Sequence, residues 1–177
     1  MGKYFGTDGF RGEANVKLTV EHAFKVGLYV GWYFGAHAGK KAKVVIGKDT
    51  RRSSYMFEYS LVAGLTASGA DAYLLHVTPT PSVSYLVRSD DFDCGIMISA
   101  SHNPFYDNGI KLINSDGNKM EAGVEELIEN YIDGMGPDIP FATGGDIGRT
   151  VDYSSGRNRY IGHLISLATR SFKIGRA

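Results

Sequence analysis

One short polar segment holds a hydroxyl, an imidazole and an ammonium group that could act on the same substrate. Residues 98–111 read ISASHNPFYDNGIK, so an apolar run ends at Ser101 and a loop with few core-forming residues follows. A serine at the end of a strand exposes its hydroxyl beside backbone N–H groups, which together could hold an anion. A serine whose hydroxyl only satisfies a turn is the alternative that position alone leaves open.

His102 and Lys111 are the candidate partners of Ser101. Neighbours along an extended chain point in opposite directions, so His102 is not obviously placed to deprotonate Ser101, and no GxSxG motif supports a hydrolytic triad. Lys111 returns within reach of Ser101, where its ammonium could offset phosphate charge or move a proton. An exposed strand lysine is the alternative. The pattern favours phosphate chemistry over triad hydrolysis.

The loop between these residues has its own turn chemistry. Pro104 favours an extended conformation at Asn103, and Asn108-Gly109 predicts a turn before an antiparallel strand over residues 110–114. We therefore expect the loop to hold one geometry.

A second polar group lies near the N-terminus, where glycines recur every third residue from Gly6 to Gly12 and frame Thr7, Asp8 and Arg11. The planar guanidinium of Arg11 could grip a phosphate in two places. The spacing is not GxGxxG, and on spacing alone the segment is a flexible loop.

A third polar group, KDTRRSS at residues 48–54, follows an expected strand and opens an expected helix. It contains Arg51. The N-terminus of that helix could bind an anion, or the serines could simply cap it.

The elements that must position these groups alternate along the chain. Apolar patterns predict strands near residues 42–49, 71–78, 93–100 and 110–114, and helices near 20–34, 53–67, 82–87 and 124–132. Gly27 and Gly31 on one helix face indicate close helix packing. The order predicts a three-layer α/β/α sandwich with a mixed, mainly parallel sheet, and a ligand site beyond the carboxyl ends of its strands.

The C-terminal part of the chain changes in composition. Residues 134–156 are rich in Gly, Pro, Ser and Thr, which indicates a boundary, so we assign residues 1–150 to one domain and 151–177 to a boundary segment and helix. The expected helix has an apolar face made by Tyr160, Ile161, Leu164, Ile165 and Ala168. That face either docks on the first domain, belongs to a second unit or mediates self-association.

Charge and apolar run lengths limit the class of protein. Lys plus Arg total 19 and Asp plus Glu total 19, so no global field favours nucleic acid or an anionic membrane. No apolar run approaches the roughly 18 residues of a membrane span, and the start lacks a signal-peptide pattern. The lone Cys94 suits a reducing cytoplasm. We expect a soluble, cytoplasmic protein.

Three segments together carry a family resemblance. FGTDGFRG at residues 5–12, GKDTRRSS at 47–54 and the segment 98–111 resemble, in this order, the first domain of the α-D-phosphohexomutase superfamily, and most of all its branch that acts on glucosamine phosphates. The likeness covers roughly residues 3–150. It implies that Ser101 is carried as phosphoserine and exchanges its phosphoryl group with a hexose or hexosamine phosphate through a sugar bisphosphate.

The resemblance also implies roles for other residues. Arg11 and Lys111 match positions that assist proton transfer and balance charge, and the matched substrate-binding and phosphate-binding positions are Thr7, Asp8, His102, Asn103 and Arg51. It implies Mg²⁺, held by the phosphate on Ser101 and by an aspartate-rich DGDGDR-type loop that this sequence lacks. We therefore expect little mutase activity from this chain alone. The alternatives are a non-catalytic phosphosugar-binding or domain-interaction fragment, and a phosphomannomutase or phosphoglucomutase of the same superfamily.

Overall fold

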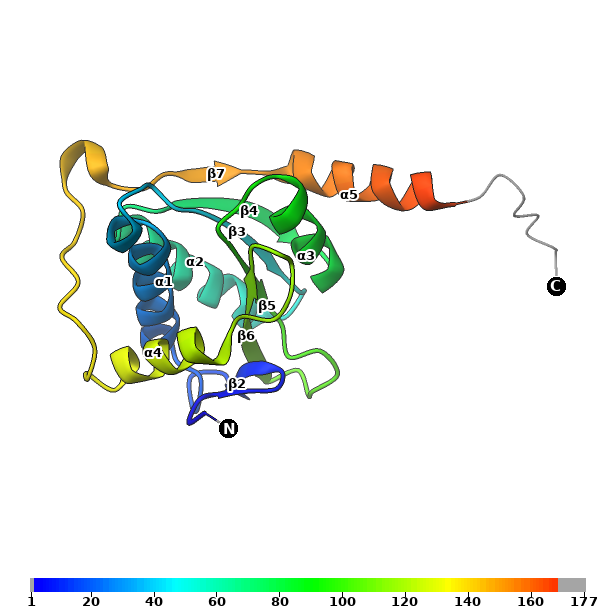
Figure 1. Cartoon of the computed structure of the whole chain (residues 1–177). Coiled ribbons are helices and arrows are strands. Elements are labelled where there is room, and N and C mark those ends of the chain that lie inside the picture. The colour runs from blue at the N-terminus through cyan, green and yellow to red at the C-terminus, as the bar shows by residue number, and fades with distance from the viewer. Residues whose placement is uncertain (1, 169–177) are drawn as a thin grey trace.

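The computed structural model describes residues 2–168, which form a layered α/β unit around one seven-stranded sheet (Figure 1). The strand order is β1-β2-β6-β5-β3-β4-β7. The strands are β1 (Phe5–Gly6), β2 (Gly9–Glu13), β3 (Lys43–Lys48), β4 (Asp71–Val77), β5 (Cys94–Ile98), β6 (Asp107–Asn114) and β7 (Thr150–Asp152). The pairs β5-β3, β3-β4 and β4-β7 are parallel, and β1-β2, β2-β6 and β6-β5 are antiparallel. The sheet is mixed, as predicted, but only half parallel.

Helices cover both faces of the sheet, which confirms the predicted three layers. They are α1 (Val20–Phe34), α2 (Arg52–Ala67), α3 (Thr80–Ser89), α4 (Ala122–Ile132) and α5 (Ser154–Leu167), with single 3-10 turns η1 (Ala36–Ala38) and η2 (Gly144–Asp146). Helices α1, α2 and α4 share one apolar cluster with the sheet, whereas α3 packs in a second cluster on the opposite face. Among residues 2–168 no helix has the length and apolarity needed to cross a bilayer.

The central strands are buried on both faces, which explains their continuous apolar sequences. Along β3, Val44 and Ile46 join the cluster under α1 and α2, while Val45 joins the cluster under α3. Every residue of β5 is buried. Polar residues that follow these strands are therefore the first that can reach the surface.

Helices α1 and α2 touch through their backbones. A Cβ atom added to Gly27 would overlap the carbonyl of Leu61, and one added to Gly64 would overlap the carbonyl of Phe24. The close packing predicted at Gly27 is confirmed, because no larger residue fits between the two helices.

The prediction of a turn at Asn108-Gly109 is wrong. Both residues lie inside β6, where Asn108 pairs with Gly12 and Gly109 pairs with Arg11. The buried amide of Asn108 donates to Ser53 Oγ at 2.8 Å, and its Oδ1 accepts the N–H of Gly109 at 2.8 Å. These tertiary contacts override the local turn preference of the Asn-Gly pair, and the chain reverses at residues 101–106 instead.

The flexible N-terminal loop predicted from spacing is an ordered hairpin. Strand β1 pairs with β2, and β2 continues the sheet beside β6. The carboxylate of Glu129 on α4 accepts the backbone N–H groups of Lys3, Tyr4 and Phe5 at 2.6–2.9 Å. The polar residues Thr7 and Asp8 lie at the exposed tip of this hairpin.

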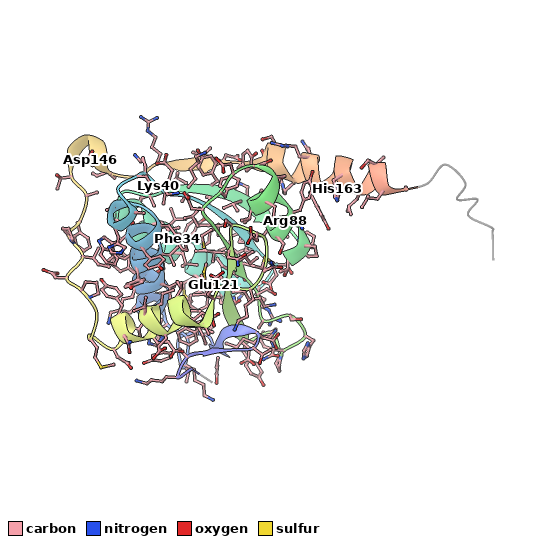
Figure 2. All side chains as sticks on the ribbon, viewed as in Figure 1. Phe34, Lys40, Arg88, Glu121, Asp146 and His163 are labelled. Carbon is pink, nitrogen blue, oxygen red and sulfur yellow. The ribbon has the colours of Figure 1, made fainter. Side chains whose placement is uncertain are left out.

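The C-terminal segment is attached at its start and largely exposed at its end. The predicted boundary after residue 150 falls inside β7, which pairs with β4 and so extends the sheet. On α5, His163 (labelled in Figure 2) stacks on Tyr85 of α3 with ring centroids 4.3 Å apart, and Tyr160 lies beside the same ring. The apolar side chains that remain exposed are Ile161, Leu164, Ile165 and Leu167. Self-association through α5 stays a prediction.

Candidate functional site

Ser101 follows the buried strand β5 and has an unusual backbone conformation. Its φ is 57°, in the left-handed region that costs a non-glycine residue about 1–2 kcal/mol. Its N–H donates to Ser99 Oγ at 3.0 Å, and Ser99 N–H donates to the carbonyl of Gly109 at 2.9 Å. Ser101 itself is exposed. The serine predicted to do chemistry therefore leaves the core in a conformation that its surroundings must hold.

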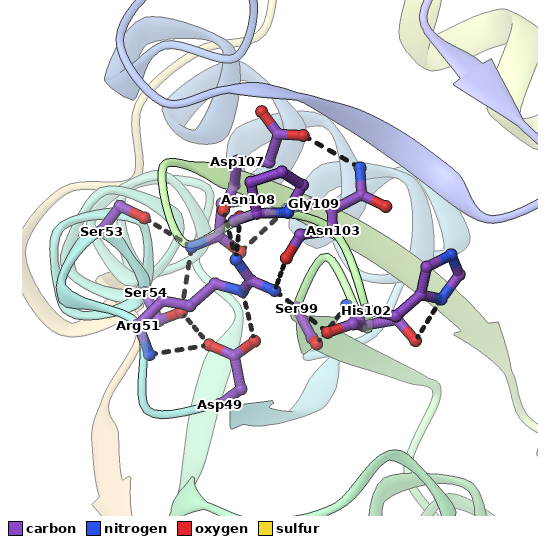
Figure 3. Close-up of polar contacts among 12 residues, drawn as sticks. Asp49, Arg51, Ser53, Ser54, Ser99, His102, Asn103, Asp107, Asn108 and Gly109 are labelled. Atoms are coloured by element: carbon purple, nitrogen blue, oxygen red, sulfur yellow. Dashed lines mark hydrogen bonds and ion pairs between the residues drawn. The ribbon is translucent and has the colours of Figure 1, made fainter.

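Arg51 holds the loop that contains Ser101 (Figure 3). All five N–H groups of its guanidinium have acceptors: Nε donates to Asp49 Oδ2 at 2.9 Å, and the two Nη atoms donate to the backbone carbonyls of Ser101, Asn103, Pro104 and Asp107. This arrangement leaves Arg51 no free donor, which is at odds with its predicted role in binding phosphate.

Asp49 anchors Arg51 at the junction of β3 and α2. Its Oδ1 accepts the backbone N–H of Arg51 at 3.0 Å and the hydroxyl of Ser54 at 2.6 Å. Partial burial acts to raise the pKa of Asp49, but the hydrogen bonds from Ser54, Arg51 and Ser99 outweigh it and hold the pKa below its usual value. Asp49 is therefore a carboxylate that supports the loop.

The other two polar residues of the loop differ in their contacts. Asn103 donates from Nδ2 to Asp107 Oδ2 at 3.0 Å and from its backbone N–H to the carbonyl of Ala100 at 3.1 Å. His102 is exposed, with its Nδ1 3.5 Å from Ser101 Oγ, at the outer limit of a hydrogen bond. Asn103 thus stabilises the loop, while the side chain of His102 is exposed to solvent.

Arg11 and Lys111 are half-buried cations on the neighbouring strands β2 and β6. Arg11 pairs with Gly109, over which its side chain lies, and Lys111 pairs with Met97. Arg11 Nη1 is 3.2 Å from Asp8 Oδ2, and within the described part of the chain its buried Nε has no hydrogen-bond partner. Partial burial and then the charge of Arg11 lower the pKa of Lys111 from its ordinary value.

The predicted site residues divide between two hollows. One is lined by Ser101, Asn103 and Arg51, together with the loop aromatics Phe105 and Tyr106. The other is lined by Thr7, Asp8 and Lys111, with residues of α3 and of the turn after β6. Arg11 on β2 packs over Gly109 of β6, the strand that carries Lys111 and that separates β2 from β5 and the Ser101 loop.

Sequence reasoning missed the supporting residues Asp49, Asp107 and Asn108. Asp49 and Asp107 bind Arg51, and Asn108 ties β6 to Ser53 and Ser54 at the start of α2. The available signal was an aspartate directly after a buried strand and before a helix start, a position that often satisfies the first N–H groups of the helix.

The comparisons with known proteins agree with this architecture. Residues 2–136 match the family model described as phosphoglucomutase/phosphomannomutase, alpha/beta/alpha domain I. The chain is 79% identical over 173 residues to a phosphoglucosamine mutase of Lachnoclostridium phytofermentans, covering 98% of this chain and 38% of that protein. It is 74% identical over 174 residues to a phosphoglucosamine mutase of Lachnospira eligens, covering 98% of this chain and 39% of that protein.

A solved structure gives the same result for the fold. A phosphoglucomutase/phosphomannomutase family protein of Burkholderia thailandensis superposes with a TM-score of 0.76 at 22% identity, covering 96% of this chain and 36% of that one. The predicted superfamily resemblance is confirmed, and the chain spans 38–39% of the length of the two curated relatives described above.

Proposed function

Because the chain belongs to the phosphoglucomutase/phosphomannomutase family, we propose that it provides the serine domain of an enzyme that interconverts glucosamine 6-phosphate and glucosamine 1-phosphate. The relatives at 79% and 74% identity, both named phosphoglucosamine mutase, support this choice of sugar. The chain spans less than half of each, so the activity of the whole protein is part of the proposal.

Ser101 carries the phosphoryl group in the proposed reaction. The bond between Ser101 Oγ and phosphorus breaks as the C1 hydroxyl of glucosamine 6-phosphate attacks, giving the sugar 1,6-bisphosphate and a free serine. The bisphosphate then reorients, and Ser101 Oγ attacks the phosphorus at C6. This step restores phosphoserine and releases glucosamine 1-phosphate. In the first step the proton of the C1 hydroxyl passes to the departing Ser101 Oγ, and in the second step the proton of that serine hydroxyl passes to the departing C6 oxygen.

One observation carries the proposal: Ser101 is the first exposed residue after the buried strand β5, and its backbone has a left-handed conformation. The side chain of Ser101 is exposed, while the backbone carbonyls of Ser101 and Asn103 are bound by Arg51. Phosphoryl transfer depends mainly on positioning and on stabilisation of charge, so an exposed hydroxyl on a loop whose backbone is held by hydrogen bonds suits it.

Arg11 and Lys111 supply positive charge to the same reaction. A phosphoserine carries a charge of about −1.5 to −2, which requires cations nearby. Arg11 and Lys111 are half-buried cations on neighbouring strands, and partial burial lowers the pKa of Lys111, which makes its ammonium a better proton donor than that of an ordinary lysine. We propose that Arg11 balances charge and that Lys111 moves the proton. Thr7, Asp8 and His102, all exposed, are proposed to contact the phosphosugar.

Mg²⁺ is implied by the resemblance, and a phosphate on Ser101 would offer it an oxygen ligand. Residues 2–168 contain no group of three or more His, Cys, Asp or Glu side chains that could hold a metal ion. The described side chains therefore do not by themselves make a complete metal site.

A chimeric protein tests the proposal. Residues 1–168 replace the matching part of the phosphoglucosamine mutase of Lachnoclostridium phytofermentans, and turnover is measured in a coupled assay with glucosamine, glucose and mannose phosphates. We expect activity on glucosamine 6-phosphate and, by peptide mass mapping, phosphate on Ser101. Preference for glucose or mannose phosphates would instead assign the chain to another activity of the superfamily. No turnover and no phosphate on Ser101 would indicate a non-catalytic module.

The location proposed with this activity is the cytoplasm. The free thiol of Cys94 is fully buried, and burial raises its pKa far above the ordinary value. Such a thiol is unreactive and fits a structural role in the core.

A further inference from the structure

The guanidinium of Arg51 is fully bound inside the protein, although it lies beside the exposed Ser101. Four of its five N–H groups bind loop carbonyls, and the fifth binds Asp49. We infer that Arg51 is a positioning residue, which fixes the Ser101 loop in the conformation that accepts and donates a phosphoryl group. The inference rests on the proposed function for the reaction, but the loop geometry can be tested without it.

Arg51 determines which side of the loop backbone faces outward. In a trans peptide the C=O and N–H groups point in opposite directions. Because the carbonyls of Ser101 and Pro104 point to Arg51, the N–H groups of His102 and Phe105 point away from it. Two backbone donors are thus presented on the outer side of the loop, where they can bind phosphate oxygens.

The conformation of Ser101 depends on this contact. A serine with φ of 57° is strained and persists only where neighbouring groups hold it. Arg51 Nη2 binds the carbonyl of Ser101 at 3.0 Å and that of Asn103 at 2.9 Å, on both sides of His102. The same guanidinium group therefore spans the turn that contains the reactive hydroxyl.

Lysine cannot make the same set of contacts. The five donors of an arginine form a rigid planar fork, whereas a lysine has a single ammonium group with three donors. Asp49 fixes the plane of the fork through Nε, and Asp49 is itself bound by Ser54 of α2. The substitution Arg51→Lys therefore keeps the charge and removes most of the contacts.

Hydrogen exchange and proteolysis test the loop geometry in this chain. Phe105 and Tyr106 are 85% and 50% exposed, so chymotrypsin can cut after them once the loop opens. In Arg51→Lys we expect amide exchange over residues 101–107 and the rate of this cleavage to rise by at least about tenfold. The matched control is Arg149→Lys, since Arg149 is exposed and its side chain makes no hydrogen bond within the described residues. It should behave as the unmodified chain.

Kinetics of the chimera test the effect on the reaction. A misplaced nucleophile lowers the rate more than it weakens binding, so Arg51→Lys should lower kcat about 100-fold with a much smaller change in KM. In Arg51→Ala, added ethylguanidinium should restore part of kcat, whereas ethylammonium should not. A purely structural role would not produce this split between kcat and KM or this selective rescue.

Two results would overturn the inference. Unchanged exchange and cleavage in Arg51→Lys would mean that Arg51 does not hold the loop. Faster exchange with an unchanged kcat would mean that the loop geometry does not matter for phosphoryl transfer. Failure of the proposed function is seen separately, because it would leave the unsubstituted chimera without phosphate on Ser101.

Discussion

The Ser101 loop and helix α5 are held in the molecule in opposite ways. Residues 99–106 form neither helix nor strand, yet Arg51 binds the loop carbonyls and the N–H groups of Ser101 and Asn103 have acceptors. Helix α5 is regular over fourteen residues, but Gly156 is its only buried residue. It contacts Tyr85 of α3 through the rings of Tyr160 and His163, and Arg159 Nη2 forms an ion pair with Asp90 Oδ1 at the end of α3, at 2.6 Å.

The comparison shows that regular backbone and fixed position are separate properties. The backbone hydrogen bonds of α5 join residues within the helix, so they do not fix its position against the rest of the protein. The loop has few local hydrogen bonds, and the side chain of Arg51, in the segment between β3 and α2, binds its carbonyls. The part of the chain proposed to do chemistry is irregular, but its backbone is bound by the guanidinium of Arg51, which lies 50 residues before Ser101 in the chain.

The most direct test of the comparison removes the reactive group and keeps the loop. In the chimera, Ser101→Ala should lower kcat by at least about 10⁴-fold, because it removes the hydroxyl proposed to carry the phosphoryl group. Coupled turnover and mass mapping of phosphate measure the loss. Ser115→Ala, at another exposed loop serine, should leave both unchanged. Phosphate on a different serine of Ser101→Ala would contradict the assignment.

The next test concerns the cation beside the loop. Lys111→Met should lower kcat by about 10²–10⁴-fold, the usual size of a proton-transfer contribution. If protonated Lys111 donates the proton, activity falls as pH rises through its pKa, and the lowered pKa moves that fall to lower pH than for an ordinary lysine. Full pH–rate profiles of the chimera check this.

Lys111→Arg separates the two roles of that cation. It keeps the charge but does not release a proton, so we expect low activity with no alkaline fall. Wild-type activity in Lys111→Arg would reduce Lys111 to a charge-balancing residue. Lys17→Met, at an exposed lysine, is the matched control.

A smaller effect is expected from the anchor of Arg51. Asp49→Asn should lower the free energy of unfolding at pH 7 by about 2 kcal/mol, since it weakens charge-assisted hydrogen bonds at a partly buried site. Because the pKa of Asp49 is lower in the folded chain, its contribution is complete above the unfolded pKa of about 3.9 and is lost as pH falls through the folded pKa.

Urea unfolding at a series of pH values checks this linkage. The difference between the original chain and Asp49→Asn should shrink below about pH 4. Asp116→Asn, at an exposed aspartate, should change little at any pH. A difference that stays constant down to pH 2 would contradict a role for the charge of Asp49.

The smallest effect is expected on α5. Leu164 is 47% exposed, so Leu164→Ser should change the unfolding free energy of the dilute chain by less than about 0.5 kcal/mol. Leu65→Ser, at a fully buried position of α2, should cost at least about 3 kcal/mol. A large loss in Leu164→Ser would mean that the exposed face is covered in solution, and sedimentation at rising concentration would then show self-association.

The sequence predicted the layers of the fold and the residues that leave the core. The strands and helices could be predicted because burial on one or both faces requires apolar residues at regular positions. The fully buried β5, for example, has a continuous apolar sequence. The Asn108-Gly109 turn failed because a pair that favours a turn locally is also able to pack in a strand. There the side chain of Asn108 finds buried partners and Gly109 leaves room for the side chain of Arg11.

The contacts inside the candidate site could not be predicted in the same way. Arg51 lies 50 residues before Ser101 in the chain, and its pattern of donors depends on where the loop carbonyls point in three dimensions. Nothing in the residue types distinguishes an arginine that binds phosphate from one that binds backbone. The edge strand β7 was missed because three residues are too few for periodicity.

The direct contact of α1 and α2 at Gly27 and Gly64 has a mechanical consequence. Side chains between two helices can change rotamer and absorb a small displacement, but two touching backbones have no such layer. A displacement of α1 at this contact therefore displaces α2 as well. Arg51 is the N-cap of α2 and binds the carbonyl of Ser101. A displacement of the two helices therefore also moves the guanidinium of Arg51 and the loop that it binds.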